Sequence, residues 1–366
     1  MDPEFAMRVV RWQRSHGRNH LPWQGTQDPY AVWLSEIMLQ QTQVGAVREY
    51  FARFMQRFPD VGALAQAPLD EVLGLWSGLG YYSRARNLHR CAREIMDQHG
   101  GQFPRSAELL QTLPGIGRST AGAIAAFCFG ERVAILDGNV RRVLARSLAF
   151  DADLSKSANE RTLWDLATGL LPRSALRTSM PAYTQGMMDL GATVCVARNP
   201  QCLVCPVADT CGARREGAPE KYPVKTRKLK RSAQSLWLLH LHTADGAVWL
   251  QRRPVPGVWA GLYCLPLFDS FEALQAAVPL RHRTRLQDAP AFVHVLTHKD
   301  LHLHPVSARV PAGTPLCAQA LPAPAQGKGE ADIEHRGEWI APEQWPQLGL
   351  PAPIRRLLQT AVRHSA

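Results

Sequence analysis

The fold of this chain is decided by the stretch Leu113-Pro114-Gly115-Ile116-Gly117-Arg118-Ser119-Thr120-Ala121. Apolar periodicity predicts one helix over residues 107–113 and another over 119–129, so this stretch is the turn between them. The two glycines allow another backbone to approach closely, and free N–H groups at the start of the second helix point at whatever occupies the turn. A phosphate group suits such a notch.

Two helices joined by the letters L-P-G-I-G form the helix-hairpin-helix signature, which holds one DNA strand through its backbone without reading the base sequence. The pattern therefore predicts that Gly115, Gly117 and Ser119 contact DNA. An ordinary glycine-rich turn between two helices remains the alternative interpretation.

Helical periodicity extends over roughly the first 200 residues. Asp28-Pro29 is an N-cap followed by a first-turn proline, and the apolar spacing that begins there continues until Phe58-Pro59. Only residues 133–136 have strand character. We predict an all-helical domain over residues 7–212, and we set aside Met1-Asp2-Pro3-Glu4-Phe5 as a cloning remnant. Further helices are expected over 69–76, 83–99, 139–150, 159–171 and 182–190.

Four cysteines follow these helices at the spacing C-x6-C-x2-C-x5-C, namely Cys195, Cys202, Cys205 and Cys211. Four thiolates within one short loop indicate a metal site. A lone first ligand before one Cys-x2-Cys pair is more typical of a 4Fe-4S cluster than of zinc, whose sites usually have two such pairs. Zinc and disulfide bonds stay open as alternatives.

The sequence changes character over residues 213–232, where basic side chains alternate with glycine and proline. We interpret this stretch as a basic linker, which is either a solvated tether or a segment that follows phosphates. Beyond it, alternation of apolar and polar residues predicts strands over 236–241, 247–250 and 301–306, with helices over 271–277 and 354–363. Residues 233–366 are therefore expected to form an α+β domain, with 318–329 as an exposed loop.

Composition favours a polyanionic partner. The 366 residues carry a formal net charge of +11 and a pI near 9.5, and no long apolar run suggests a membrane. No signal peptide or transmembrane segment is visible, so Cys91, Cys128, Cys264 and Cys317 are expected to be reduced thiols in a cytoplasmic protein.

Two carboxylates are candidates for chemistry. Asp137 stands at the start of a predicted helix, where an aspartate is more commonly an N-cap than a catalyst. Glu36 lies among apolar side chains, an environment that favours the protonated form and would let it donate a proton near neutral pH, although the edge of an amphipathic helix is an equal alternative. One protonated and one ionised carboxyl group are what N-glycosidic cleavage needs.

These features resemble the base-excision DNA glycosylase superfamily, and in particular the MutY family of adenine DNA glycosylases. The resemblance rests on the hairpin, the cysteine loop, Leu21-Pro22-Trp23, Ser35-Glu36-Ile37-Met38-Leu39-Gln40-Gln41-Thr42-Gln43-Val44, Gly78-Leu79-Gly80-Tyr81-Tyr82-Ser83 and Leu136-Asp137-Gly138-Asn139-Val140. It covers nearly the whole chain.

The resemblance implies roles for these residues. Glu36 would protonate adenine at N7, and Asp137, helped by Asn139, would stabilise the cationic sugar. Gln41, Thr42 and Tyr81 would lie beside an 8-oxoguanine opposite the adenine, while the adenine is flipped out of the duplex. Endonuclease III-like relatives carry a lysine nucleophile where this chain has Ser119, so we expect a monofunctional glycosylase.

The C-terminal domain resembles the Nudix fold but lacks the glutamate-rich Nudix box. Its lesion-inspecting tripeptide would be Leu296-Thr297-His298, which keeps a hydroxyl and loses an aromatic ring relative to the Phe-Ser-His of the family. His294, His302 and His304 are interpreted as polar faces of strands and not as metal ligands.

The sequence therefore predicts an adenine DNA glycosylase with a 4Fe-4S cluster, acting as a monomer on duplex DNA with A:8-oxoguanine or A:G mispairs, in the bacterial cytoplasm at the nucleoid. The alternatives are an endonuclease III-like glycosylase with lyase activity and a non-catalytic DNA-binding iron–sulfur protein.

Overall fold

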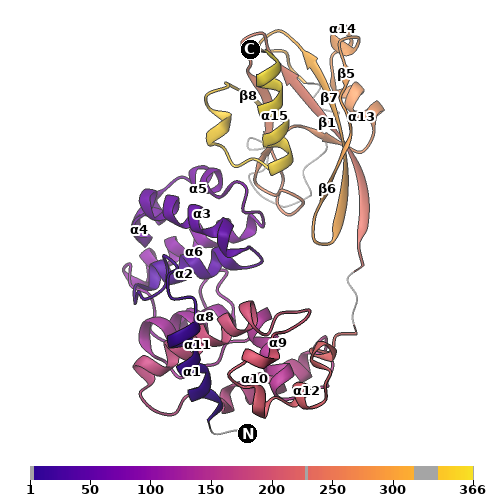
Figure 1. The fold of residues 1–366 in the computed structure, drawn as a ribbon. Helices are drawn as coiled ribbons and strands as arrows, with labels where there is room; N and C mark the ends of the chain where they lie inside the picture. The colour runs from indigo at the N-terminus through magenta and orange to yellow at the C-terminus, as the bar shows by residue number, and fades with distance from the viewer. Residues whose placement is uncertain (1–3, 227–229, 317–336, 366) are drawn as a thin grey trace. The chain divides into compact units, whose positions relative to one another are not determined.

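A computed structural model describes residues 4–226, 230–316 and 337–365, with side chains described up to residue 361. The chain forms two compact units: one comprises Met1–Gln66 and Asn87–Lys228, and the other comprises Ala67–Arg86 and Leu229–Ala366. Figure 1 shows the helical elements of the first and the sheet of the second. Cys317 and the expected loop 318–329 lie outside the described residues. No helix in the described part of the chain is long and apolar enough to cross a bilayer.

The first unit contains helices and no strand among residues 4–66 and 87–226, which confirms the all-helical prediction; residues 133–136 form neither a helix nor a strand. Its helices are α1 (Phe5–His16), α2 (Pro29–Leu39), α3 (Val44–Arg57), α4 (Val61–Gln66), most of α6 (Ser83–His99), α7 (Ala107–Leu110), α8 (Arg118–Ile124), α9 (Gly138–Ser147), α10 (Ser157–Gly169), α11 (Leu176–Thr193) and α12 (Gly212–Arg215). A core of residues from α1, α9, α10 and α11 joins them.

Helix α2 begins as the sequence predicts. The carboxylate of Asp28 accepts hydrogen bonds from the N–H groups of Tyr30 (3.0 Å) and Ala31 (3.3 Å), so two of the unpaired donors at the helix start are satisfied. The helical stretch expected to continue to Phe58 is interrupted between α2 and α3, where Gln41 has a φ of 56°. A left-handed residue cannot continue a right-handed helix, and the interruption leaves residues 40–43 as a loop.

The hairpin forms between α7 and α8. Gly115 has a φ of 78°, and a Cβ at this position would lie 2.6 Å from the Cβ of Asn87, so only glycine fits. The helix that follows changes at Ala125–Phe129 into a π-helix, a rare form that often accompanies functional sites.

The second unit is built on one eight-stranded sheet, in which β3 (Tyr263–Cys264), β2 (Val248–Arg252), β1 (Ser232–His242), β7 (Lys299–Arg309) and β5 (Gln287–Asp288) are successive neighbours. Strands β1 and β7 are parallel, and β6 (Phe292–Val295) pairs antiparallel with β7. The remaining elements are β4 (Leu267–Phe268), β8 (Glu338–Ile340), α13 (Phe271–Ala277), α14 (Leu280–Arg283) and α15 (Ala352–Ser365).

Alternation along β1 divides the core of the second unit into two layers. Leu236 and Leu238 pack in one apolar cluster with residues of α15, whereas Leu239 and Leu241 pack in another with residues of α13. Successive side chains of a strand point to opposite faces, so the sheet is covered on both sides. The predicted α+β domain is confirmed.

The compact units differ from the expected domains at residues 67–86, which contain α5 (Leu69–Trp76) and pack with the C-terminal sheet. Arg252 donates to both carboxylate oxygens of Asp70, at 2.8 and 2.6 Å. A Cβ on Gly74 would lie 2.0 Å from the carbonyl oxygen of Gln347, so this helix and the residues before α15 fit only because position 74 has no side chain.

The first part of the expected linker packs against the helical unit. Tyr222 is buried, its carbonyl accepts from Nε of Arg146 at 3.2 Å, and the carbonyl of Val224 accepts from the N–H of Leu154 at 3.0 Å. Residues 213–226 are therefore held in place, while Lys221 and Lys225 remain exposed.

Candidate active site

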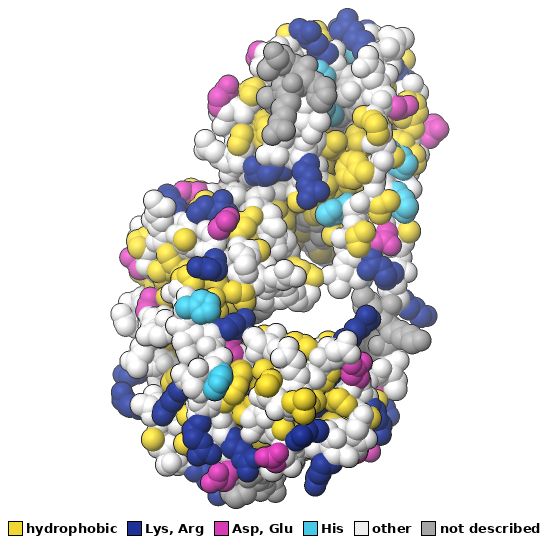
Figure 2. Space-filling view, in the orientation of Figure 1, with side chains coloured by type: hydrophobic (Ala, Val, Ile, Leu, Met, Phe, Trp, Pro, Cys, Tyr) yellow, Lys and Arg dark blue, Asp and Glu magenta, His cyan; other side chains and the backbone are white. Residues whose placement is uncertain are grey.

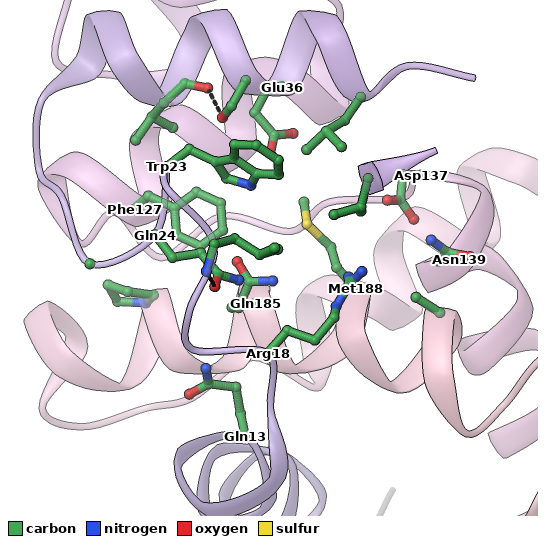
Figure 3. Close-up of a pocket in the computed structure, with 18 of the residues that line it drawn as sticks. Gln13, Arg18, Trp23, Gln24, Glu36, Phe127, Asp137, Asn139, Gln185 and Met188 are labelled. Atoms are coloured by element: carbon green, nitrogen blue, oxygen red, sulfur yellow. Dashed lines mark hydrogen bonds between the residues drawn. The ribbon is translucent and has the colours of Figure 1, made fainter. Parts of the chain in front are cut away.

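A deep cleft in the helical unit brings the two candidate carboxyl groups together. Glu36 projects from α2, and Asp137 stands at the start of α9; Figure 3 shows both in the wall of the same pocket. The cleft has a volume of about 1460 Å³, more than the roughly 300–1,000 Å³ typical of small-molecule sites, so it has room for a nucleotide. Asn139, Gln41, Thr42 and Ser119 also line it.

Glu36 is a weak acid in this cleft. Burial raises its pKa from 4.5 to about 8, and the negative charge of Asp137 acts in the same direction. The side chains that precede it on α2, from Tyr30 to Ser35, are all buried, and Glu36 itself is partly buried where it lines the cleft. Glu36 is therefore mostly protonated at neutral pH.

Asp137 is both the N-cap of α9 and a wall residue of the cleft. Its carboxylate accepts a hydrogen bond from the N–H of Val140 at 2.7 Å. Burial raises the pKa of Asp137, but the N–H groups of Val140 and Asn139 and the positive charge of Arg142 oppose that shift. Because Asp137 has these partners for its ionised form, a proton shared by the two acids belongs on Glu36.

Asn139 is held on the same helix turn by Arg142. The Oδ1 atom of Asn139 accepts from Nη2 of Arg142 at 2.8 Å, and Arg142 also donates to the carbonyls of Cys195 (2.8 Å) and Gly191 (2.5 Å). The amide of Asn139 is thus fixed beside Asp137.

Ser119 has a structural partner in the cleft. Its hydroxyl accepts from the N–H of Leu136 at 3.0 Å, directly before Asp137. A hydroxyl here supplies no amine for Schiff-base chemistry. Gly115 and Gly117 lie in the hairpin and do not line the cleft.

The sequence did not single out three connected polar residues, of which Arg18 and Gln185 line the cleft and Asp189 contacts both. Asp189 on α11 is completely buried and accepts from Nε of Arg18 at 2.7 Å and from Nε2 of Gln185 at 2.9 Å. One N–H of the Gln185 amide is bonded to Asp189, which leaves its carbonyl oxygen and its second N–H for a bound base. The sequence signal was a lone acid among apolar residues, Met187-Met188-Asp189-Leu190.

Aromatic rings form the wall near these polar groups. Trp23 and Phe127 line the cleft close to Gln24 (Figure 3). Phe127 belongs to the π-helix, so the irregular turn places its ring in the wall. Flat aromatic surfaces beside fixed hydrogen-bonding groups suit a planar heterocyclic base.

The four cysteines line one small, separate cavity between α9, α11 and the loop 195–211. Burial raises the pKa of Cys205 to about 12, and the charges of the other three cysteines act in the same direction. Such thiols need a cationic group to become thiolates. Arg146 donates to Sγ of Cys195 at 3.4 Å, a contact that would offset negative charge on sulfur.

Four cysteine thiols around one cavity fit a 4Fe-4S cluster, which takes four thiolate ligands.

The second unit brings Tyr81 and Thr297 together across 216 positions of sequence. Their hydroxyl oxygens lie 2.6 Å apart. Tyr81 is 43% exposed and has a φ of 48°, and Thr297 and His298 are exposed in the turn between β6 and β7. The pair therefore presents hydroxyl groups on the surface of this unit.

Comparisons with protein families agree with both units. Residues 34–168 match the model of the HhH-GPD superfamily of base excision DNA repair proteins, residues 195–211 match the iron–sulfur binding domain of endonuclease III, and residues 237–360 match the NUDIX domain. The cluster prediction is therefore confirmed.

The chain is similar to proteins named adenine DNA glycosylase. An adenine DNA glycosylase of Buchnera aphidicola is 33% identical over 359 residues, with 97% of each chain covered. The human adenine DNA glycosylase is 44% identical over 227 residues, which are 59% of this chain and 40% of the human one. Among solved structures, a thermostable thymine-DNA glycosylase has a TM-score of 0.50 and 28% identity, covering 58% of this chain and 95% of its own. The chain therefore belongs to the adenine DNA glycosylase family and is a monofunctional DNA glycosylase, a hydrolase of N-glycosyl bonds.

Proposed function

We propose that this enzyme removes adenine that is paired with 8-oxoguanine or guanine in duplex DNA. The observation that supports the chemistry most strongly is the shared cleft of Glu36 and Asp137, in which one acid keeps a proton at neutral pH and the other has hydrogen-bond donors for its charge. That division of labour is what cleavage of an N-glycosidic bond requires.

The adenine must leave the base stack to enter this cleft, because its glycosidic bond cannot be reached within a duplex. Glu36 then donates its proton to N7 of the base. The bond between C1′ and N9 breaks, its electron pair moves into the adenine ring, and the sugar becomes a cation. Asp137 stabilises this cation electrostatically, with Asn139 beside it, until the oxygen of a water molecule bonds to C1′ and its proton passes to the Glu36 carboxylate, which restores the acid.

Side chains of the cleft support adenine as the base that this enzyme removes. The bond to Asp189 orients the amide of Gln185, and the carbonyl oxygen of that amide can accept a hydrogen bond from an exocyclic amino group. Trp23 and Phe127 offer flat surfaces for the ring.

Other residues would recognise the base opposite the adenine and hold the DNA. Gln41 and Thr42, in the loop between α2 and α3, would lie beside the base opposite the adenine, and the Tyr81–Thr297 pair with His298 would inspect that base for the 8-oxo group. The hairpin residues Gly115, Gly117 and Ser119 would hold the DNA backbone. The net charge of +11 favours this polyanionic partner.

Cys195, Cys202, Cys205 and Cys211 would hold the 4Fe-4S cluster. When bound, the cluster supplies positive charge that keeps four thiolates in one loop, and it thereby orders the basic residues Arg198, Arg214 and Arg215 near DNA. It takes no part in the hydrolysis proposed here. In this proposal the enzyme acts as a monomer, in the cytoplasm and at the nucleoid.

A base-release assay tests the proposal. Duplexes that differ only in the base opposite adenine, namely 8-oxoguanine, guanine or thymine, are incubated with excess enzyme. Release should be fastest opposite 8-oxoguanine and undetectable opposite thymine, and Glu36→Gln should abolish release while leaving DNA binding. The matched control is Glu49→Gln, the same change at an exposed glutamate of α3. Equal release from all three duplexes would refute the specificity, and a wild type that binds DNA but never releases base would favour the non-catalytic alternative.

A borohydride trapping experiment addresses the lyase alternative. A lyase forms a Schiff base between a lysine and C1′, which borohydride reduces to a stable covalent adduct. No lysine lies between residues 114 and 129, so trapping should be negligible. A strong adduct would favour the endonuclease III-like mechanism.

A further inference from the structure

The turn Leu296–Lys299 connects β6 to β7 and carries Thr297. The N–H of Leu296 donates to the carbonyl of Lys299 at 2.8 Å and closes the turn. Leu296 packs at the edge of a hydrophobic cluster, whereas Thr297 and His298 are exposed. Few apolar contacts therefore restrain the part of the turn that meets Tyr81.

Arg231, the residue directly before β1, restrains the turn. Its Nη1 atom donates to the carbonyl oxygen of Thr297 at 2.9 Å, and its Nη2 atom is bonded to Oδ1 of Asp300. The N–H of Ser232 donates to the carbonyl of His298 at 3.1 Å, next to this contact. The guanidinium of Arg231 thus bonds both to the Thr297 carbonyl within the turn and to the Asp300 carboxylate just after it.

The chemistry of this bridge needs arginine. A guanidinium presents several N–H groups in a rigid plane and can bind two acceptors at once, whereas an ammonium is a point charge on a flexible chain. The side chains of Arg231 and Asp300 are 42% and 34% exposed, so their ion pair adds little to global stability. Its effect is local, because it fixes the backbone of the residue that touches Tyr81.

We propose that Arg231, with Asp300, is a positioning residue that fixes Thr297 against Tyr81 and thereby sets the preference for the base opposite the adenine. This inference rests on the proposed inspection of that base by Thr297 and Tyr81. The sequence placed Arg231 in a basic linker that could follow phosphates; in the structure its charge is paired with Asp300.

The first test compares two variants that each remove one positive charge. Arg231→Gln loses the bridge, whereas Lys225→Gln removes an exposed charge of the expected basic linker. Single-turnover adenine release is measured on duplexes with 8-oxoguanine or guanine opposite adenine. In Arg231→Gln the ratio of the two rate constants should fall by about three- to tenfold, the size expected for losing hydrogen bonds that favour one arrangement.

Lys225→Gln should weaken binding to both duplexes equally and reduce the dependence of affinity on salt, with the ratio of rates unchanged. Arg231→Lys keeps the positive charge but not the planar guanidinium that binds two acceptors. Its ratio of the two rate constants should therefore lie between those of the wild type and Arg231→Gln. A ratio in Arg231→Gln equal to that of the wild type, or an equal loss on both duplexes, would overturn the inference.

A second measurement needs no DNA. Hydrogen exchange of the amides of residues 296–299 should become faster in Arg231→Gln and stay unchanged in Lys225→Gln, while melting temperatures stay within about 2 °C of each other. Unchanged exchange would show that Arg231 does not order the turn. A wild type that releases no adenine would refute the proposed function itself, which the exchange measurement does not depend on.

Discussion

The pKa of Glu36 makes a quantitative prediction about the pH dependence of catalysis. With a pKa of about 8, roughly nine in ten Glu36 side chains are protonated at pH 7, compared with about three in a thousand at the ordinary value of 4.5. If the protonated form is the catalyst, burial in the cleft raises the active fraction at pH 7 by a factor of about 300. The shift is thus a large part of the roughly 10²–10⁴-fold that a general acid contributes.

The assay is single-turnover adenine release with enzyme prebound to an A:8-oxoguanine duplex, measured between pH 6 and pH 10. The rate constant should be nearly flat to pH 7, half-maximal near pH 8 and tenfold lower for each further pH unit. Glu49→Gln should keep this profile, and Glu36→Gln should lose at least about a hundredfold at pH 7. A rate that is constant from pH 7 to pH 9.5, or that already falls tenfold per pH unit from pH 6 to pH 7, would refute the assignment of Glu36 as the proton donor with a raised pKa.

Four further predictions follow from the structure. Because the folded pKa of Glu36 is raised, its destabilising effect is absent below pH 4.5 and grows as the pH rises to about 8; Glu36→Gln should therefore be more stable than wild type in urea unfolding at pH 9, and not at pH 4.5. Asp137→Asn keeps an N-cap acceptor but loses the charge, so base release should fall by about 10²–10³ while the melting temperature changes little. Cys202→Ser should reduce the visible absorbance of the cluster and lower the melting temperature; unchanged absorbance would contradict the assignment of this thiol. Gly74→Ala should destabilise the protein by about 1–3 kcal/mol, because its Cβ would lie 2.0 Å from the Gln347 oxygen, whereas Gly45→Ala on α3 meets nothing within 4 Å and should be neutral in thermal unfolding.

Several features of the fold could be predicted because they depend on neighbouring residues. Asp28 caps α2 through N–H groups two and three positions away, and alternation along β1 assigns its side chains to the two faces of the sheet. The interruption after α2 was not predicted, because the apolar spacing of α2 and α3 passes without a visible break over Gln41, which adopts a left-handed conformation. Periodicity reports which face is buried and not where the backbone turns.

The candidate site was predicted only in part. Glu36 and Asp137 were chosen by their local surroundings and by resemblance, and the cleft places them together. Arg18, Gln185 and Asp189 were missed, because Arg18 lies 171 positions from the acid that holds it and nothing in its own surroundings marks it as functional. A polar residue in an apolar helix, such as Asp189, is the signal that could have led to them.

The sequence by itself determined the helical and α+β units, the hairpin and the cysteine loop, because each is specified by turn, capping and ligand spacing within a few residues. Only the tertiary structure decided that Glu36 keeps its proton, that Arg231 pairs with Asp300, and that Thr297 reaches a tyrosine 216 positions away. Burial and charge at an atom depend on every segment packed around it, and those segments are distant in the chain.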